Sequence, residues 1–439
     1  MKTSRAAVLL LAATLTLAAQ SNSNPSTPES KKSPVTHTTP IAKKDPLAVH
    51  RAAIVIDTHA DTTQRLLDEN YDLTEPLHGG HLNFEAAKKG NLGAEFFSIW
   101  VEPKQYKGQY AHRTLQLIDA VYHQAALHPD RMRMAFSPAD IEAAHREHKL
   151  AALMGIEGGH SIENDMGLLR DYYRLGVRYM TLTWSNSNDW ADSSGDIDNK
   201  TIPHTEQGLT EFGKDVVYQM NRLGMMIDIS HVADRTFFRT LNISRAPVIA
   251  SHSSARALCS HPRNMTDDML RALAINGGVV MVNFYSAFLS DDFRKAWAAQ
   301  APERTKAEDN LKSKLIAAGK PINYDAIDAL DKEFAAKIPR PPFSVLIDHI
   351  DHIAKVAGID HVGLGSDFDG IPSLPEGIDS AADLPKITEA LMARGYSPSD
   401  CDKILGGNFL RVFRQVEQVS KTLKDENRPR IFEKQPFDK

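Results

Sequence analysis

The stretch from Ala53 to Thr62 joins a short apolar, β-branched run to a polar ending that could bind a metal. Such a run, bounded by polar residues, is typical of a strand buried on both faces. Because side chains alternate along a strand, His59 and Asp61 would point the same way from its end. An imidazole and a carboxylate suit a divalent transition metal, zinc first. Two ligands do not complete a site, and a capping aspartate beside a surface histidine would give the same local pattern.

Four later apolar runs also end in residues that bind metals or carry protons. They end in the segments Gly155–His160, Asp228–His231, Ala250–Ser253 and Gly365–Gly370. If these ends meet, the candidate ligands are His59, Asp61, Glu157, His231 and His252. They suffice for two ions if Glu157 bridges them, because each ion then has three protein ligands and an open position for water. Two ions about 3.5–4 Å apart lower the pKa of a shared water and polarise a carbonyl, as metal-assisted hydrolysis requires.

The last of these segments offers a group for proton transfer. Asp367 could take the proton from the water and return it to the leaving amine. A turn-capping role is the alternative for a carboxylate in Ser-Asp-Phe-Asp-Gly, and Asp369 fits that role better.

A fold that brings distant strand ends together is indicated by the order of the apolar runs. Eight short β-rich runs alternate with helical stretches: Ala53–Asp57, Ala94–Trp100, Ala151–Ile156, Arg178–Thr183, Met225–Ser230, Pro247–Ser251, Gly278–Asn283 and Val362–Ser366. This alternation predicts an α/β protein with the (β/α)₈ TIM-type barrel, in which the carboxyl ends of the strands converge on one site. The open doubly wound sheet is the rival, but no glycine-rich dinucleotide motif follows the first run.

Four of the intervening stretches have acidic starts and the apolar spacing of amphipathic helices. They are Asp165–Leu175, Glu206–Leu223, Asp234–Leu241 and Asp267–Asn276. The charged, alanine-rich stretch from Ser290 to Pro342 predicts a helical insertion before the eighth strand. Ser397–Val419 predicts a closing helix interrupted near Gly406 and Gly407, so one barrel domain would span residues 48–425.

The ends of the chain differ in composition from this domain. Lys2 and Arg5 precede an apolar run, Ala6–Ala19, which predicts a signal peptide over residues 1–21 and an exported protein, periplasmic or extracellular. The run is too short to span a membrane, and no nearby cysteine could accept a lipid anchor. Residues 22–47 would form a disordered leader and 426–439 a polar tail.

Composition limits the partners. The 439 residues carry a formal charge of −5 with 24% charged and 42% hydrophobic residues, so no basic surface argues for nucleic acid. Cys259 and Cys401 are the only cysteines, which excludes a disulfide-built scaffold but leaves their pairing open. The sequence does not fix the oligomeric state, and a homodimer is compatible with it.

The motifs together resemble the membrane or renal dipeptidases, peptidase family M19, a branch of the metal-dependent amidohydrolases, and here a secreted, bacterial-type member. The matching segments are His59-x-Asp61, Gly155–Ser161, Arg178–Thr183, Asn221–Gly224, Asp228–Val232, Ser251–Ser254, Arg263–Asn264, Val280–Tyr285, Gly365–Gly370 and Asn408–Val412.

The resemblance implies a two-zinc barrel enzyme that cleaves dipeptides, often with a D-residue at the carboxyl end, and sometimes opens the lactam of carbapenems. It implies that His59, Asp61 and Glu157 hold one zinc, and that Glu157, His231 and His252 hold the other. It further implies that Arg263 binds the substrate carboxylate and that Asp367 is the acid/base.

The chain departs from the family pattern at two residues and in the insertion before Pro342, which lengthens one rim loop. Trp184 stands where relatives commonly have a histidine directed at the scissile carbonyl, and an indole can donate one hydrogen bond but cannot be a cation. Its bulk predicts a narrower substrate range that favours small residues, with His160 and His204 as candidate substitutes for the missing donor. Phe288 aligns with a tyrosine that often contacts substrate.

Two other functions stay open on the sequence. One is a different amidohydrolase activity, on an N-acyl amino acid, a lactam, a lactone or a phosphoester. The other is a non-catalytic peptide-binding barrel that has lost turnover through Trp184. A guanidinium at Arg263 favours substrates with a free carboxylate, because it can pair with that group in two bonds.

Overall fold

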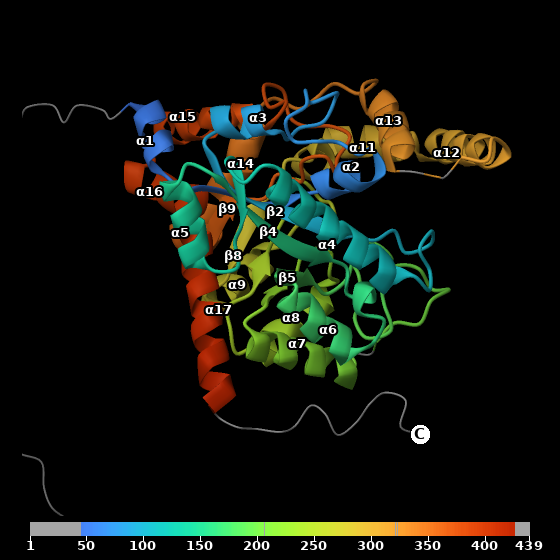
Figure 1. Ribbon diagram of the computed structural model, residues 1–439, viewed down its shortest axis with the longest axis horizontal. Coiled ribbons are helices and arrows are strands. Elements are labelled where there is room, and N and C mark those ends of the chain that lie inside the picture. The colour runs from blue at the N-terminus through green and yellow to red at the C-terminus, as the bar shows by residue number, and fades with distance from the viewer. Residues whose placement is uncertain (1–44, 206, 321, 323, 426–439) are drawn as a thin grey trace, which may run out of the picture. The chain divides into compact units, whose positions relative to one another are not determined.

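The computed structural model describes residues 45–205, 207–320, 322 and 324–425 (Figure 1). The expected signal peptide, nearly all of the leader and the tail at 426–439 lie outside these residues. Within them, the strands are β1 Val55–Ala60, β2 Leu92–Trp100, β3 Met132–Met134, β4 Leu150–Glu157, β5 Val177–Thr181, β6 Met226–Asp228, β7 Ile249–Ala250, β8 Val279–Val282 and β9 Val362–Leu364.

Eight of these strands close into a parallel barrel. The ring runs β1, β2, β4, β5, β6, β7, β8, β9 and back to β1, and every neighbouring pair is parallel. All eight predicted strands are present and the (β/α)₈ prediction is confirmed. The short β3 was missed; it lies outside the ring, beside the first residues of β4.

The barrel strands alternate with helices, as predicted. The helices are α1 Pro46–Ala52, α2 Thr62–Asp68, α3 Phe84–Lys89, α4 Tyr110–Leu127, α5 Pro138–Arg146, α6 Met166–Arg174, α7 Glu211–Leu223, α8 Asp234–Ile243, α9 Asp267–Asn276, α10 Ser286–Leu289, α11 Asp291–Ala299, α12 Ala301–Ala317, α13 Tyr324–Ala335, α14 Ser344–Ala357, α15 Pro385–Ala393, α16 Pro398–Asp402 and α17 Asn408–Asp425. The predicted start of α7, Glu206, lies outside the described residues, and residues 207–210 are not helical. Thr210 caps this helix by accepting a hydrogen bond from the Gly213 N–H, so the helix begins at Glu211.

The amino-terminal end of the barrel is closed by α17. Phe409 and Phe413 on this helix belong to the same buried cluster as Ile56, Phe96 and Tyr179 of the barrel strands. The interruption predicted near Gly406 is a five-residue π-helical segment, Lys403–Gly407, between α16 and α17. A β-carbon at Gly406 would lie 2.2 Å from the Ile54 carbonyl oxygen, so the chain can pass β1 here only as glycine.

The insertion between β8 and β9 is helical, as predicted, and consists of α11, α12 and α13 (Figure 1, gold to orange). Arg340, just after it, donates hydrogen bonds to the carbonyl groups of Leu374, Pro375 and Ile378, which ties the end of the insertion to the loop after β9. Among all the helices described, none has the length and apolar character needed to cross a bilayer.

Candidate metal centre and substrate cavity

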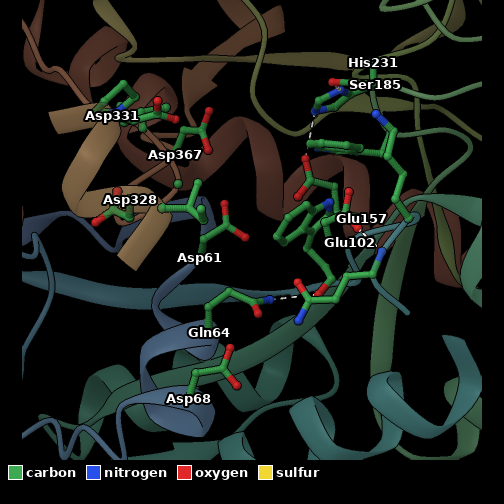
Figure 2. Close-up of a pocket in the computed structure, with 18 of the residues that line it drawn as sticks. Asp61, Gln64, Asp68, Glu102, Glu157, Ser185, His231, Asp328, Asp331 and Asp367 are labelled. Atoms are coloured by element: carbon green, nitrogen blue, oxygen red, sulfur yellow. Dashed lines mark hydrogen bonds and ion pairs between the residues drawn. The ribbon is translucent and has the colours of Figure 1, made fainter. Parts of the chain in front are cut away.

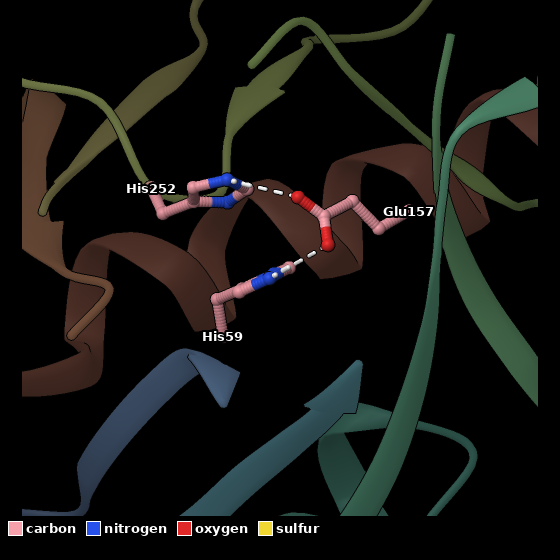
Figure 3. A group of neighbouring side chains, drawn as sticks. All are labelled: His59, Glu157 and His252. Carbon is pink, nitrogen blue, oxygen red and sulfur yellow. Dashed lines mark ion pairs between the residues drawn. The ribbon is translucent and has the colours of Figure 1, made fainter. Parts of the chain in front are cut away.

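Three predicted ligands converge at the carboxyl ends of β1, β4 and β7 (Figure 3). The Nε2 atom of His59 lies 3.4 Å from Oε2 of Glu157, and Nε2 of His252 lies 3.4 Å from Oε1 of the same carboxylate. Their ligand atoms all lie within 4.8 Å of one another. Strand ends almost 200 residues apart in sequence therefore present their side chains to one point, as the barrel topology requires.

The two remaining predicted ligands complete the group. His231, after β6, places Nε2 2.8 Å from Oε1 of Glu157 and 3.0 Å from Nε2 of His252. Asp61 places Oδ2 3.7 Å from Nε2 of His59. One Glu157 oxygen thus faces His59 and the other faces His231 and His252, which is the division of ligands expected of a bridging carboxylate.

The hydrogen bonds behind His59 fix which of its nitrogens can bind a cation. The Tyr179 hydroxyl donates to the Thr58 carbonyl at 3.0 Å, so it accepts from Nδ1–H of His59 at 2.8 Å. The lone pair of the neutral His59 ring is then on Nε2. This nitrogen and Oδ1 of Asp61 are both buried, and neither has a hydrogen-bond partner. Buried acceptors without donors are costly, and a divalent cation would satisfy both.

His252 is held in the same way by a different pair of residues. The Ser251 hydroxyl donates to Oδ2 of Asp228 at 2.6 Å and lies 2.7 Å from Nδ1 of His252, which therefore carries the proton. Asp228 is fully buried and also accepts the backbone N–H of Ser230 and of Ser251. Such outer partners orient metal-binding histidines and set their tautomer, so the residues present fit a divalent ion with nitrogen and oxygen ligands.

Without a cation, burial opposes charge at Glu157, His231 and His252. At His59 burial also disfavours the charged form, but the neighbouring Tyr179 and Glu157 raise the pKa of this imidazole well above its usual range. Burial raises the pKa of Glu157 to about 7 and lowers the pKa of His231 and His252 well below the usual range. Neutral imidazoles are the form that binds metals. A nearby divalent ion would favour the ionised form of Glu157 and so reverse the effect of burial on this carboxyl.

Asp367 lies beside the first ligand pair. Its carboxylate groups with His59 and Asp61, with ligand atoms within 4.8 Å of one another. The residue has a φ of +66°, a conformation rarely adopted outside glycine, and His231 shares it. Burial raises the pKa of Asp367. Its neighbour Asp369 instead accepts from the His81 N–H and the Thr62 hydroxyl, both at 2.6 Å, and so has a structural role.

The cluster opens into a cavity of about 790 Å³. Figure 2 shows Asp61 and Asp367 on one side of it, with Asp328 and Asp331 of α13 beside them, and Glu157 on the opposite side. The helical insertion therefore forms part of the cavity wall. This volume lies within the range of small-molecule sites.

The predicted carboxylate-binding residue also lines the cavity. Arg263 is 6% exposed and donates to the Ser253 hydroxyl at 3.3 Å and to the His252 carbonyl at 3.1 Å. Its guanidinium carbon lies 5.4 Å from the ring centre of Phe288, another cavity residue. Burial lowers the pKa of Arg263 to about 10, so the side chain remains cationic near neutral pH.

Trp184 lines the cavity and packs against a second indole, that of Trp100. The ring centres of Trp184 and Trp100 are 5.0 Å apart, and that of His231 is 6.3 Å from Trp184. The two candidate substitutes for the missing histidine are engaged elsewhere. His160 bonds to the Val101 carbonyl at 2.8 Å and His204 to the Asn199 carbonyl at 3.0 Å.

The sequence analysis did not identify the residues that form hydrogen bonds with His59 and Asp367. Tyr179 lies in the middle of β5, and alternation along that strand could have placed it inside the barrel. Asn283 directly follows β8, a strand end like those of the ligands, and donates to Oδ2 of Asp367 at 2.7 Å. No sequence signal pointed to Asp328 and Asp331, which reach the cavity only through the packing of the insertion.

The motifs and this geometry agree with comparisons to known proteins. A family model described as membrane dipeptidase, peptidase family M19, matches residues 44–427. The chain belongs to this family. Dipeptidase tcpJ of Claviceps purpurea is 33% identical over 366 residues, which cover 82% of this chain and 74% of the relative. Dipeptidase 3 of Mus musculus is 32% identical over 385 residues, covering 87% of this chain and 68% of the mouse protein.

Solved structures of a probable dipeptidase and of a metallopeptidase share the fold of this M19 member. The probable dipeptidase PvdM from Pseudomonas aeruginosa superposes with a TM-score of 0.72 at 25% identity, over 85% of this chain and 98% of that one. A metallopeptidase from Rhodobacter sphaeroides, solved with a phosphinate mimic of the dipeptide L-Ala-D-Ala, gives a TM-score of 0.66 at 25% identity, over 83% and 99% of the two chains. The family and the fold expected from the motifs are both confirmed.

Proposed function

We propose that this M19 protein is a binuclear zinc dipeptidase that hydrolyses the peptide bond of free dipeptides, including those with a D-residue at the carboxyl end. The observation that carries the proposal is the position of Glu157, with one carboxylate oxygen toward His59 and the other toward His231 and His252. Histidine and carboxylate ligands with an open cavity beside them are typical of catalytic zinc.

Each proposed role follows from where a side chain lies. His59, Asp61 and Glu157 would hold one zinc, and Glu157, His231 and His252 the other. When bound, the two ions would supply a nucleophilic water near neutral pH and polarise the scissile carbonyl. Asp367 would take a proton from the attacking water and give one to the leaving amine, since its carboxylate is beside the first ligand pair and lines the cavity.

The class of substrate follows from Arg263. A buried guanidinium at the cavity wall would bind the terminal carboxylate of a dipeptide in two bonds and hold the peptide bond over the metal centre. Lactones and phosphoesters without a carboxylate leave this cation unpaired, which disfavours them. An N-acyl amino acid keeps the carboxylate and is therefore the alternative substrate that the cavity favours next.

We also propose export of the protein through the signal peptide predicted at residues 1–21, to the periplasm or the extracellular space. Mass spectrometry of the protein secreted from its own host would find a new amino terminus after about residue 21.

The catalytic proposal is tested by metal analysis and a dipeptide panel on protein purified without chelator. We expect about two equivalents of zinc or a similar divalent ion, activity on L,L- and L,D-dipeptides, and loss of activity with a chelator. Asp367→Asn should keep the metals and lose roughly a hundredfold in turnover. Asp234→Asn is the matched control, because Asp234 does not line the cavity and its carboxylate accepts two hydrogen bonds from Arg256 instead.

Each part of the proposal can fail separately. One tightly held metal equivalent or none would exclude the bridged centre. Metal-replete protein that cleaves N-acyl amino acids but no free dipeptide would indicate the alternative amidohydrolase activity. Normal turnover in the Asp367→Asn variant would assign proton transfer to another group.

A further inference from the structure

Asn283 is a fully buried amide directly after β8 and bonds to the proposed acid/base. Its Nδ2 atom lies 2.7 Å from Oδ2 of Asp367. Its Oδ1 atom lies 2.6 Å from the backbone nitrogen of Tyr285. A backbone N–H can only donate, so the amide oxygen faces Tyr285 and the NH₂ group faces Asp367. The orientation of the amide is therefore fixed by the chain and does not depend on the state of the carboxylate.

This contact makes the two oxygens of Asp367 unequal. Oδ2 is occupied by the Asn283 donor. Oδ1 lies toward Gly370, where a β-carbon would come within 2.7 Å of it and within 2.0 Å of Oδ2 of Asp61. Asp367 and Gly370 both line the substrate cavity. Oδ1 is thus the oxygen on the side of Asp61 and the cavity, and glycine at 370 gives both carboxylates the room to converge.

We propose that Asn283 is a positioning residue that directs proton transfer to Oδ1 of Asp367. The inference rests on the proposed dipeptidase function. Because Oδ2 already accepts a hydrogen bond, the proton lost when a water O–H bond breaks forms its new bond to Oδ1. The same Oδ1–H bond then breaks as a new N–H bond forms on the leaving amine, while the peptide C–N bond breaks. The carboxylate ends the cycle ionised and again bonded to Asn283.

A double-mutant cycle separates this role from ordinary structural support. The variants are Asn283→Ala, Asp367→Asn and the two together, measured with one dipeptide substrate that the wild type cleaves. We expect Asn283→Ala to lower kcat roughly 10- to 100-fold, the scale of a hydrogen bond to a charged group, with KM changed by less than about twofold. In the Asp367→Asn background the same substitution should change kcat by less than about twofold.

Two further variants keep the test valid if the truncation disturbs folding. Asn283→Asp has the same shape and still accepts from the Tyr285 N–H, but it presents an oxygen to Asp367 and should lower kcat at least as far as Asn283→Ala. Asn221→Ala is the control, since this equally buried amide on α7 accepts from the Arg245 N–H in the loop after α8, and its loss should leave kcat unchanged. Metal content should match the wild type in all of these variants.

The outcomes distinguish the inference from the proposed function. Equal losses from Asn283→Ala in both backgrounds, or wild-type kcat in Asn283→Asp, would overturn the positioning role. Loss of metal in Asn283→Ala would overturn it too, since the residue would then support the metal centre. Full activity of Asp367→Asn, by contrast, would contradict the acid/base assignment of the proposed function.

Discussion

Replacing Tyr179 with phenylalanine would remove one oxygen atom from the barrel interior and with it the partner of a proposed metal ligand. The hydroxyl is fully buried and lies 2.8 Å from Nδ1 of His59. Without it, Nδ1–H of His59 is unpaired, which costs about 1–3 kcal/mol for a buried donor. The imidazole is then free to adopt the other tautomer, in which Nε2 carries the proton and cannot bind a cation. We expect zinc affinity to fall by about 10–100-fold, the usual effect of losing such a partner.

The assay is a zinc titration in competition with a chromophoric chelator, with the free energy of unfolding of the metal-free protein measured in urea. Tyr172→Phe is the matched control: this hydroxyl is equally buried and donates to the Ser161 carbonyl at 2.9 Å, but it contacts no proposed ligand. The control should lose similar stability and keep its zinc affinity within about twofold. Unchanged zinc affinity in Tyr179→Phe would refute the tautomer argument. An equal loss of zinc affinity in both variants would show that general destabilisation of the fold, and not the tautomer of His59, weakens zinc binding.

Two further substitutions test the substrate side of the cavity. Arg263→Met should raise KM for free dipeptides at least about tenfold, and far more than for dipeptide amides, because it removes a two-bond partner of the terminal carboxylate. Similar losses for both substrates would make Arg263 structural, which its bond to the His252 carbonyl would also allow. Trp184→His should raise turnover on ordinary L,L- and L,D-dipeptides by up to the 10²–10³-fold range of one oxyanion donor and broaden acceptance. Lower turnover on the best substrate would instead make Trp184 a specificity element.

The barrel and the convergence of the candidate ligands could be predicted because both depend on short stretches of sequence. A β-branched run of five or six residues is enough to indicate a buried strand, and the polar residue that ends it is adjacent in the chain. His59, Glu157 and His252 were found in this way. β3 was missed because Met132–Met134 is too short to show any period.

The roles of Tyr179 and Asn283 could not be predicted from the sequence, since the residues that they contact are distant in the chain. Tyr179 contacts His59 across 120 residues, and Asn283 contacts Asp367 across 84. The positive φ of His231 was equally unforeseen, because no glycine or asparagine marks that position. Alternation along β5 and the strand end at Asn283 indicate that the side chains of Tyr179 and Asn283 face inward. Which residues they contact depends on how the barrel closes.

Substrate selectivity is the property least accessible from the sequence, because part of the cavity wall comes from the insertion. The charged, alanine-rich sequence of this segment predicts helices but not the direction in which Asp328 and Asp331 point. In the folded chain α13 packs near α2, and both carboxylates line the cavity. Burial raises the pKa of Asp331 to about 6, although Arg304 lies 3.5 Å away. The ionised form of this carboxyl group is therefore poorly stabilised at this position. The proposed ligands and Asp367 therefore come from strand ends that the sequence pattern indicates. The preference for the substrate's side chains also depends on α13, whose position is determined by long-range packing.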